Sequence, residues 1–210
     1  MALLLGLLKP FEVWNDVVLR IGRVLAIIAI AVMVLAILVQ VFFRYALNNA
    51  LPWPDEAARF LMLWMTGLLA PMAFRRGGFV AIDTLPLMLP SRLTTALSLV
   101  LLLISAFVLA VGVRIAWSEV TGFGATFSTS SLYVPFAFGD GVCEALGAKQ
   151  AGATVWCRVP RLWAFLSLFV GVVLLLIVNL ELILRALVAL LGGADRLKPL
   201  SMPEEELMAE

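Results

Sequence analysis

Long apolar segments separated by short polar ones dominate the sequence. A helix needs roughly 20 mostly apolar residues to cross a hydrocarbon core of about 30 Å. Some apolar runs reach that length by themselves, and a shorter one becomes long enough when it is counted from Pro54, because proline suits the first turn of a helix. The pattern predicts an all-α integral membrane protein with four membrane-spanning helices, at about 24–43, 54–74, 92–114 and 161–184.

The segment ahead of the first predicted span has a different pattern. Between residues 11 and 22, apolar side chains recur at helical spacing with charged side chains among them. This pattern is typical of an amphipathic helix in the membrane interface, with its apolar face towards lipid and its charges towards water. We therefore expect an N-terminal amphipathic interfacial helix at 11–22.

Three other segments connect or follow the spans. Residues 79–90 are apolar but contain an aspartate and two prolines, which predicts an interfacial hairpin. Residues 117–160 form a long third loop with several aromatic residues, and 195–210 form a polar, acidic tail. Aromatic groups in such a loop either rest on the membrane surface or form a docking surface for a partner, and the sequence leaves both interpretations open.

Basic residues between the spans indicate the orientation. The N-terminal flank, the second loop and the C-terminal flank carry three lysines or arginines each, whereas the first and third loops carry two and four. Cytoplasmic flanks of membrane proteins carry an excess of these residues. The pattern, and the Arg75–Arg76 pair in particular, predicts that both termini are cytoplasmic and that the third loop is periplasmic.

Composition narrows the class of protein. The chain is 63% hydrophobic and 14% charged, whereas soluble domains have roughly 45–50% apolar and about 25% charged residues, so the excess apolar surface needs lipid. A net charge of +1 gives no electrostatic case for nucleic acid. The chain has no histidine, which removes bis-histidine haem, the usual catalytic triads and most catalytic zinc sites. We expect no enzyme, no cofactor and no metal site.

A charged turn opens the second predicted span. Asp55 and Glu56 precede Arg59 by about one helical turn, so both carboxylates reach the guanidinium group. One interpretation is a self-paired helix start, with Trp53 as an interfacial anchor. The other is that the turn pairs with another subunit, because charge near hydrocarbon is costly and usually has an assigned partner.

Small residues recur along the third predicted span. They share one helix face, because a seven-residue step drifts only about 20° on a straight helix. We interpret them as a packing stripe that another helix approaches closely, against the alternative of chance placement. The stripe consists of Ser91, Ser98, Ser105 and Gly112.

Glu181 and Arg185 lie one turn apart near the end of the fourth predicted span. We expect a pair whose charged groups snorkel to the interface. The alternative, a coupling-ion site, needs a carboxylate near the bilayer midplane. Glu181 follows Arg161 by about 20 residues, which at about 1.5 Å per residue places it near the far interface. The interiors of the other three spans contain no ionisable side chain, unlike a self-sufficient ion-coupled carrier.

Several short motifs occur together between Arg44 and Leu85. An arginine follows the first span, a Trp-x-acid-acid-x-x-Arg motif opens the second, a tryptophan lies within it, and an Arg-Arg-Gly turn closes it ahead of an aspartate. A Thr-x-x-Leu-x-x-Pro element precedes the last span. The residues are Arg44, Trp53, Asp55, Glu56, Arg59, Trp64, Arg75, Arg76, Gly77, Asp83, Thr129, Leu132 and Pro135.

This set resembles the small membrane subunit of tripartite ATP-independent periplasmic (TRAP) transporters, the DctQ-like family. The sequence departs from the family's pattern in three places. Asp55 stands where glutamate is usual, a histidine of the family is replaced around Phe79, and residues 136–159 are an insertion.

The resemblance implies a scaffold subunit in the bacterial inner membrane. In that family a periplasmic substrate-binding protein delivers an organic acid to a large permease subunit, which carries the sodium and substrate sites. By resemblance, none of the following side chains touches substrate, and they support the subunit interface or membrane anchoring: Arg44, Trp53, Asp55, Glu56, Arg59 and Trp64. Two alternatives stay open, an independent oligomeric small transporter or exporter and a cofactor-free membrane anchor of another complex.

The two cysteines, Cys143 and Cys157, both lie in the predicted periplasmic loop, within the inserted segment. An oxidising compartment supports a disulfide between them. Closing a loop of about 15 residues is worth about 3 kcal/mol in the chain-entropy model. We predict a Cys143–Cys157 bridge, with two unrelated thiols as the alternative.

Overall fold

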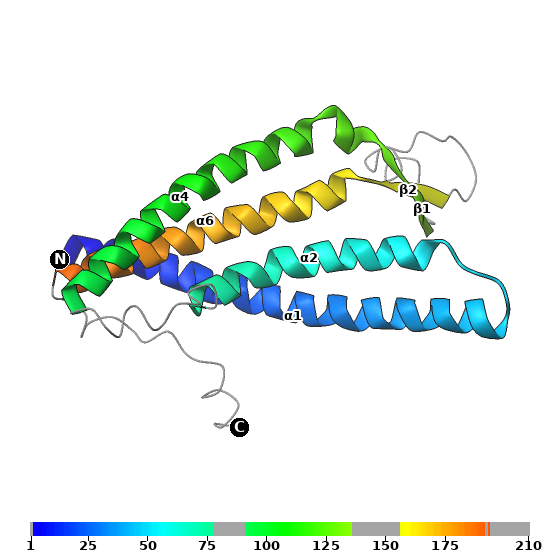
Figure 1. Cartoon of the computed structure of the whole chain (residues 1–210), viewed down its shortest axis with the longest axis horizontal. Helices are drawn as coiled ribbons and strands as arrows, with labels where there is room; N and C mark the ends of the chain where they lie inside the picture. Colours follow the sequence, from blue (N-terminus) through cyan, green and yellow to red (C-terminus); the bar gives the residue numbers. More distant parts are fainter. Residues whose placement is uncertain (1, 78–90, 136–155, 192, 194–210) are drawn as a thin grey trace, which may run out of the picture. The chain divides into compact units, whose positions relative to one another are not determined.

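The computed structural model describes residues 2–77, 91–135, 156–191 and 193. Its long helices are α1 (Ala2–Ala46), α2 (Trp53–Arg75), α4 (Ser91–Thr121) and α6 (Leu162–Leu190), as Figure 1 shows. Each is long and apolar enough to cross a membrane, so the prediction of four spanning helices is confirmed. A short 3-10 helix, η1 (Phe123–Thr126), and two strands, β1 (Ser128–Pro135) and β2 (Trp156–Pro160), lie between α4 and α6 in the chain. The strands were not predicted.

The N-terminal segment differs from the prediction. Residues 11–22 belong to the uninterrupted helix α1, so a separate amphipathic interfacial helix is not supported. The side chains of Trp14, Val17 and Ile21 are more than half exposed, whereas Glu12 is bonded to a residue of another helix. These apolar side chains are exposed, as expected of a face towards lipid, whereas the expectation that charged side chains face water fails for Glu12, whose partner lies inside the protein.

The chain divides into two compact units. The first contains Met1–Gly22, Leu69–Gly112 and Val172–Glu210, and the second contains Arg23–Leu68 and Val113–Gly171. Each long helix contributes residues to both units.

In the second unit, α6 packs closely on α2 and α4. A Cβ atom added to Gly171 would lie 2.8 Å from the Cα atom of Gly67, so the two helix backbones touch there. Only glycine leaves room for such a contact. The rings of Trp117 and Phe169 lie 5.4 Å apart between centroids and join α4 to α6. Buried alanines, Ala26, Ala29 and Ala36, line one face of the α1 part of this unit.

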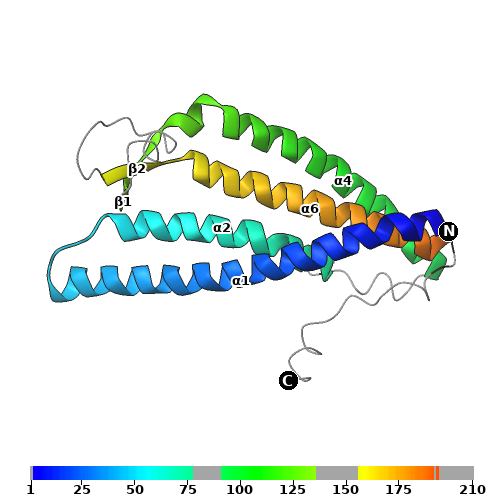
Figure 2. The same cartoon turned by 180° about the vertical axis from the view of Figure 1, so that it is seen from behind.

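A two-stranded antiparallel sheet connects the end of α4 with the start of α6 in the same unit (Figure 2). Ser128 pairs with Pro160, and Pro135 pairs with Trp156. The register shifts between Ser128 and Tyr133, which marks an irregularity in β1. Such irregularities take backbone groups out of the ladder and leave them available to other partners.

In the first unit, α6 packs on α4. The side-chain amide of Asn179 donates to the carbonyl oxygen of Leu102 at 3.2 Å, and a Cβ atom added to Gly112 would lie 3.3 Å from Cγ1 of Val172. Of the other members of the predicted small-residue stripe, Ser105 is half-buried and Ser98 is exposed. The side chain of Ser91 lies outside the described part, so the stripe stays a prediction.

Candidate functional site

A group of charged and polar side chains joins α1, α2 and α6 in the first unit. Its centre is the carboxylate of Glu181, which has no exposed surface. The side-chain amide of Asn15 donates to Oε2 at 2.6 Å, Nη2 of Arg75 donates to Oε1 at 2.8 Å, and Nε of Arg185 donates to Oε1 at 3.0 Å. We call the whole group the Glu181 cluster: Glu12, Asn15, Asp16, Arg75, Glu181 and Arg185.

Each arginine of the Glu181 cluster bridges two carboxylates. Arg75 also donates to Asp16, and Arg185 also donates to Glu12 at 2.6 Å. Both acidic partners lie on α1, so the arginines tie the buried carboxylate of α6 to the first helix. A buried ion pair repays its desolvation only with good geometry and further hydrogen bonds, and this network supplies both.

The predicted pair of Glu181 and Arg185 is confirmed. Its interpretation as a snorkelling pair is wrong, because Glu181 is completely buried and holds groups from three helices. The sequence pattern showed the spacing of the pair on one helix. It gave no signal that Asn15 and Arg75 meet the same carboxylate.

A second carboxylate, Glu56, binds the irregular part of β1 in the second unit. Its Oε2 atom accepts hydrogen bonds from the backbone N–H groups of Ser131 at 2.6 Å and Leu132 at 2.8 Å. Its Oε1 atom accepts one from the N–H group of Ser130 at 3.1 Å, and the Ser131 hydroxyl lies 2.6 Å from Oε2. We call Glu56, Ser130, Ser131 and Leu132 the Glu56 site.

Thr129 closes the loop that forms the Glu56 site. Its side chain is buried, and its hydroxyl donates to the carbonyl oxygen of Val159 on β2 at 2.8 Å. The Thr-x-x-Leu element therefore has a physical role: the threonine holds β1 to β2, and the next three residues present their N–H groups to Glu56. Two motifs that lie far apart in the sequence meet at this point.

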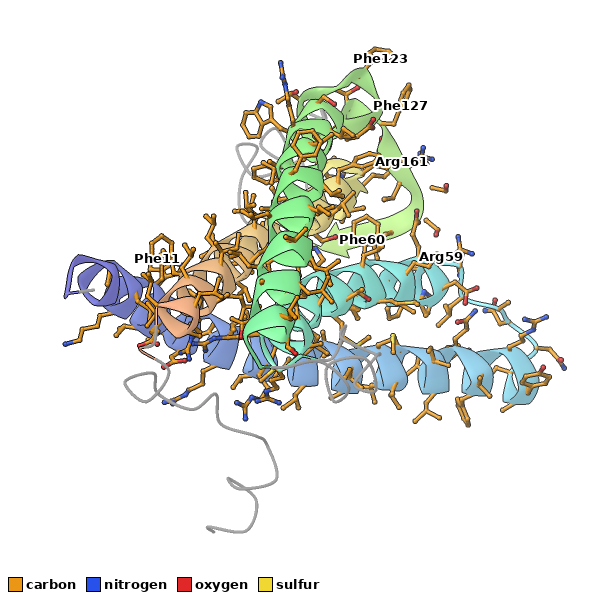
Figure 3. All side chains as sticks on the ribbon, turned by 60° about the vertical axis from the view of Figure 1, so that its left-hand side comes forward. Phe11, Arg59, Phe60, Phe123, Phe127 and Arg161 are labelled. Atoms are coloured by element: carbon orange, nitrogen blue, oxygen red, sulfur yellow. The ribbon has the colours of Figure 1, made fainter. Side chains whose placement is uncertain are left out.

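The structure separates the residues predicted for a subunit interface. Glu56 is bonded within the chain, and Trp64 is half-buried. Four others are exposed: Arg44, Trp53, Asp55 and Arg59. In Figure 3 the side chain of Arg59 extends away from α2. Among the described residues no ion pair joins Arg59 to Asp55 or Glu56, so the self-paired interpretation of the charged turn is not supported.

Two aromatic side chains of the third loop are exposed. Phe123 and Phe127 are 81% and 49% exposed, and their rings meet edge to face with centroids 5.1 Å apart (Figure 3). The backbone N–H of Arg161 donates to the carbonyl oxygen of Phe127 at 2.9 Å, which holds this turn against the start of α6. Both interpretations of the loop, membrane contact and partner docking, stay open.

Several predictions fall outside the described residues. These are the hairpin at 79–90, the tail at 195–210 and most of the inserted segment at 136–159. Cys143 also lies outside them, and only the backbone of Cys157 is described. The Cys143–Cys157 bridge therefore stays a prediction.

The fold and the two sites define a multi-pass membrane protein whose buried or bonded carboxylates hold its own elements together. A comparison with protein families agrees with this class. The model of the family described as "Tripartite ATP-independent periplasmic transporters, DctQ component" matches residues 33–189. The chain belongs to this family and is a small subunit of a TRAP transporter, as the sequence motifs indicated. A comparison with curated proteins found no match.

Proposed function

We propose that this chain is a membrane scaffold for the large permease subunit of a TRAP transporter. The complex takes up an organic acid that a periplasmic binding protein delivers, with sodium as the coupling ion. In this proposal the substrate and ion sites belong to the large subunit. The alternatives, an independent oligomeric transporter or exporter and a cofactor-free anchor of another complex, are outcomes of the test below.

One observation carries the scaffold role. Among the described residues, Glu181 carries the only fully buried carboxylate. Its two oxygens accept hydrogen bonds from Asn15 on one side and from Arg75 and Arg185 on the other. A cation could bind there only by displacing these donors against the charge of two guanidinium groups. An ion-coupled carrier needs a carboxylate that is available to its ion. The carboxylate of Glu181 instead has a structural role, which supports a subunit that does not itself carry the ion.

The proposal includes an orientation in the inner membrane. The distribution of lysine and arginine favours cytoplasmic termini, with the Arg75–Arg76 pair on the same side. The start of α2 and the β1–β2 sheet then lie on the periplasmic side. Reporter fusions at Asn49 and Gly77 test this directly. A reporter that works only in the periplasm should be active at Asn49 and silent at Gly77, and the reverse result would overturn the orientation.

The scaffold role is tested by purification and transport. When the chain is co-expressed with the large permease subunit and the binding protein, a tag on the small chain should recover the large subunit from detergent. Liposomes with both membrane subunits, supplied with the binding protein, should accumulate an organic acid in a sodium gradient. Liposomes with this chain alone should not. Uptake by the chain alone would establish the independent transporter, and recovery of a different membrane complex would establish the anchor.

A further inference from the structure

We propose that one exposed face of α2 is the surface on which the large permease subunit docks. The face consists of Asp55, Arg59, Met62, Leu63 and Thr66, and we call it the α2 stripe. All five side chains are exposed, and their spacing of three, four and seven residues places them on one side of the helix. This inference rests on the proposed function and assigns a surface to it.

The first argument is a mismatch between polarity and burial. Of the four candidate spans, α2 has the lowest mean hydropathy, yet less of it is buried than of α1 or α6. The span with the least burial is α4, which is strongly apolar, as expected of a helix that faces lipid. A helix as polar as α2 is better covered by protein than by lipid tails. Another chain is therefore expected to cover its exposed side.

The second argument concerns charge at the start of the α2 stripe. Asp55 and Arg59 carry opposite charges one turn apart, and the described part of the chain provides neither of them with an ion pair. Glu56, which lies between them in sequence, is fully engaged with β1. Charges near hydrocarbon usually have an assigned partner. Asp55 and Arg59 therefore fit a partner that presents a positive charge to the first and a negative charge to the second.

The rest of the α2 stripe fits a membrane helix of that partner. Met62 is 58% exposed and has a side chain that adapts to irregular surfaces. The hydroxyl of Thr66 donates to the carbonyl oxygen of Met62 at 2.8 Å, so it does not need a further partner. Thr66 lies about 16 Å beyond Asp55 along the helix axis. The α2 stripe thus runs from a charged end to a small, locally satisfied residue near mid-membrane, where close packing is favoured.

A second copy of this chain is a poorer occupant than the large subunit. Two copies in one membrane have the same orientation, so a two-fold contact through the α2 stripe places each residue at the same depth as its equivalent. Asp55 would then face Asp55, and Arg59 would face Arg59. Like charges opposed in this way disfavour association. A different chain, with a cation opposite Asp55 and an anion opposite Arg59, has no such conflict.

Photo-crosslinking in the assembled complex tests the surface. A photoreactive amino acid is placed at Met62 in one variant and at Leu101 of α4 in another, since both side chains are 58% exposed. The Met62 variant should crosslink to the large subunit, and the Leu101 variant should crosslink mainly to lipid. Crosslinks to the large subunit from Leu101 alone, to a second copy from Met62, or only to lipid from Met62 would each overturn the inference.

Charge reversal tests whether the large subunit carries charges complementary to Asp55 and Arg59. Asp55→Arg and Arg59→Asp should each lower recovery of the large subunit by about tenfold, the scale expected for loss of a close interfacial charge pair. Thermal unfolding of the small chain alone should be unchanged in Arg59→Asp and only slightly lowered in Asp55→Arg, where a basic side chain enters the first turn of α2. Combining the two substitutions should not restore the yield of large subunit, because each charge pairs with the partner and not with the other charge. Recovery in the double variant would show that the two side chains pair with each other and would overturn the inference.

Co-purification and crosslinking together distinguish a wrong docking surface from a wrong function. If the large subunit co-purifies with the wild-type chain but crosslinks elsewhere, the α2 stripe is the wrong surface and the scaffold function stands. If the large subunit does not co-purify with the wild-type chain at all, the proposed function fails first, and the α2 stripe fails with it.

Discussion

Glu56 and Glu181 show two different ways in which a membrane protein accommodates a carboxylate. Glu56 is half-buried and is held by three backbone N–H groups and a hydroxyl of β1. Glu181 is fully buried and is held by two guanidinium groups and an amide from three helices. The first arrangement gives a strand its shape. The second holds helices together.

The two sites differ in the kind of group that loses its hydrogen-bond acceptor when the carboxylate is removed. Loss of Glu56 leaves neutral N–H groups without their acceptor in a part of the molecule that is only partly buried. Loss of Glu181 removes the buried counter-charge that the guanidinium groups of Arg75 and Arg185 share, and both groups stay largely buried. A buried uncompensated charge is costlier than an unpaired neutral donor. The two sites are therefore expected to differ in energy even though both centre on one glutamate.

The largest effect is expected for Glu181→Ala. This change should lower the free energy of unfolding by about 3–5 kcal/mol, the usual cost of removing one partner of a buried ion pair. Unfolding of the purified chain in detergent, followed by tryptophan fluorescence, measures it. Leu180→Ala is the matched control, since Leu180 is the adjacent residue of α6 and is 39% exposed. Equal losses for the two variants would show that the Glu181 cluster is not the stabilising feature.

A smaller effect is expected for Glu56→Ala. We expect a loss of about 1–3 kcal/mol, because the change leaves part-buried N–H groups without their acceptor. Hydrogen exchange should localise the effect to the amides of Ser130, Ser131 and Leu132. Glu56→Gln keeps one acceptor oxygen and should lose less. Unchanged exchange at these three amides would contradict the Glu56 site.

A still smaller loss in the free energy of unfolding is expected for Thr129→Val, which keeps the shape of the side chain. It removes the hydrogen bond to the carbonyl oxygen of Val159, and a bond of this kind contributes about 1 kcal/mol. Thr126→Val is the control, because the hydroxyl of Thr126 bonds only within its own turn, to Phe123, and the residue is exposed. If both variants unfold at the same temperature, Thr129 does not hold β1 to β2.

The smallest effect is expected for Asp55→Asn, next to Glu56 in the sequence. In the isolated chain, the free energy of unfolding should change by less than about 0.5 kcal/mol, as is typical of exposed sites. The same unfolding assay measures it beside Glu56→Ala. A loss as large as that of Glu56→Ala would mean that the two neighbouring carboxylates do not differ in role and would remove the contrast between them.

The parts of the fold that depend on local sequence were predictable. Four spanning helices follow from the length of the apolar runs, because lipid selects for local apolarity. The acidic pair at Asp55 and Glu56 could be recognised as a motif. Its division into one bonded and one exposed carboxylate could not, since the partners of Glu56 lie 74 to 76 residues further along the chain.

The N-terminal segment shows why the remaining features escaped prediction. Helical periodicity tells which residues share a face, but it does not tell whether that face meets lipid or protein. Glu12 and Asp16 pair with Arg185 and Arg75, which lie on other helices far along the chain. The contact between Gly67 and Gly171 is similar, because a single glycine in a span carries no sign of its counterpart in another helix.

The pairing of Pro135 with Trp156 has a practical consequence for engineering this protein. Directly opposed residues of antiparallel strands have Cα atoms about 4.5–5.5 Å apart. The segment 136–155 therefore leaves and re-enters the described structure at adjacent points. A small rigid domain whose own termini lie equally close could replace that segment without pulling β1 and β2 apart. Such a fusion would add recognisable mass to this subunit for electron microscopy.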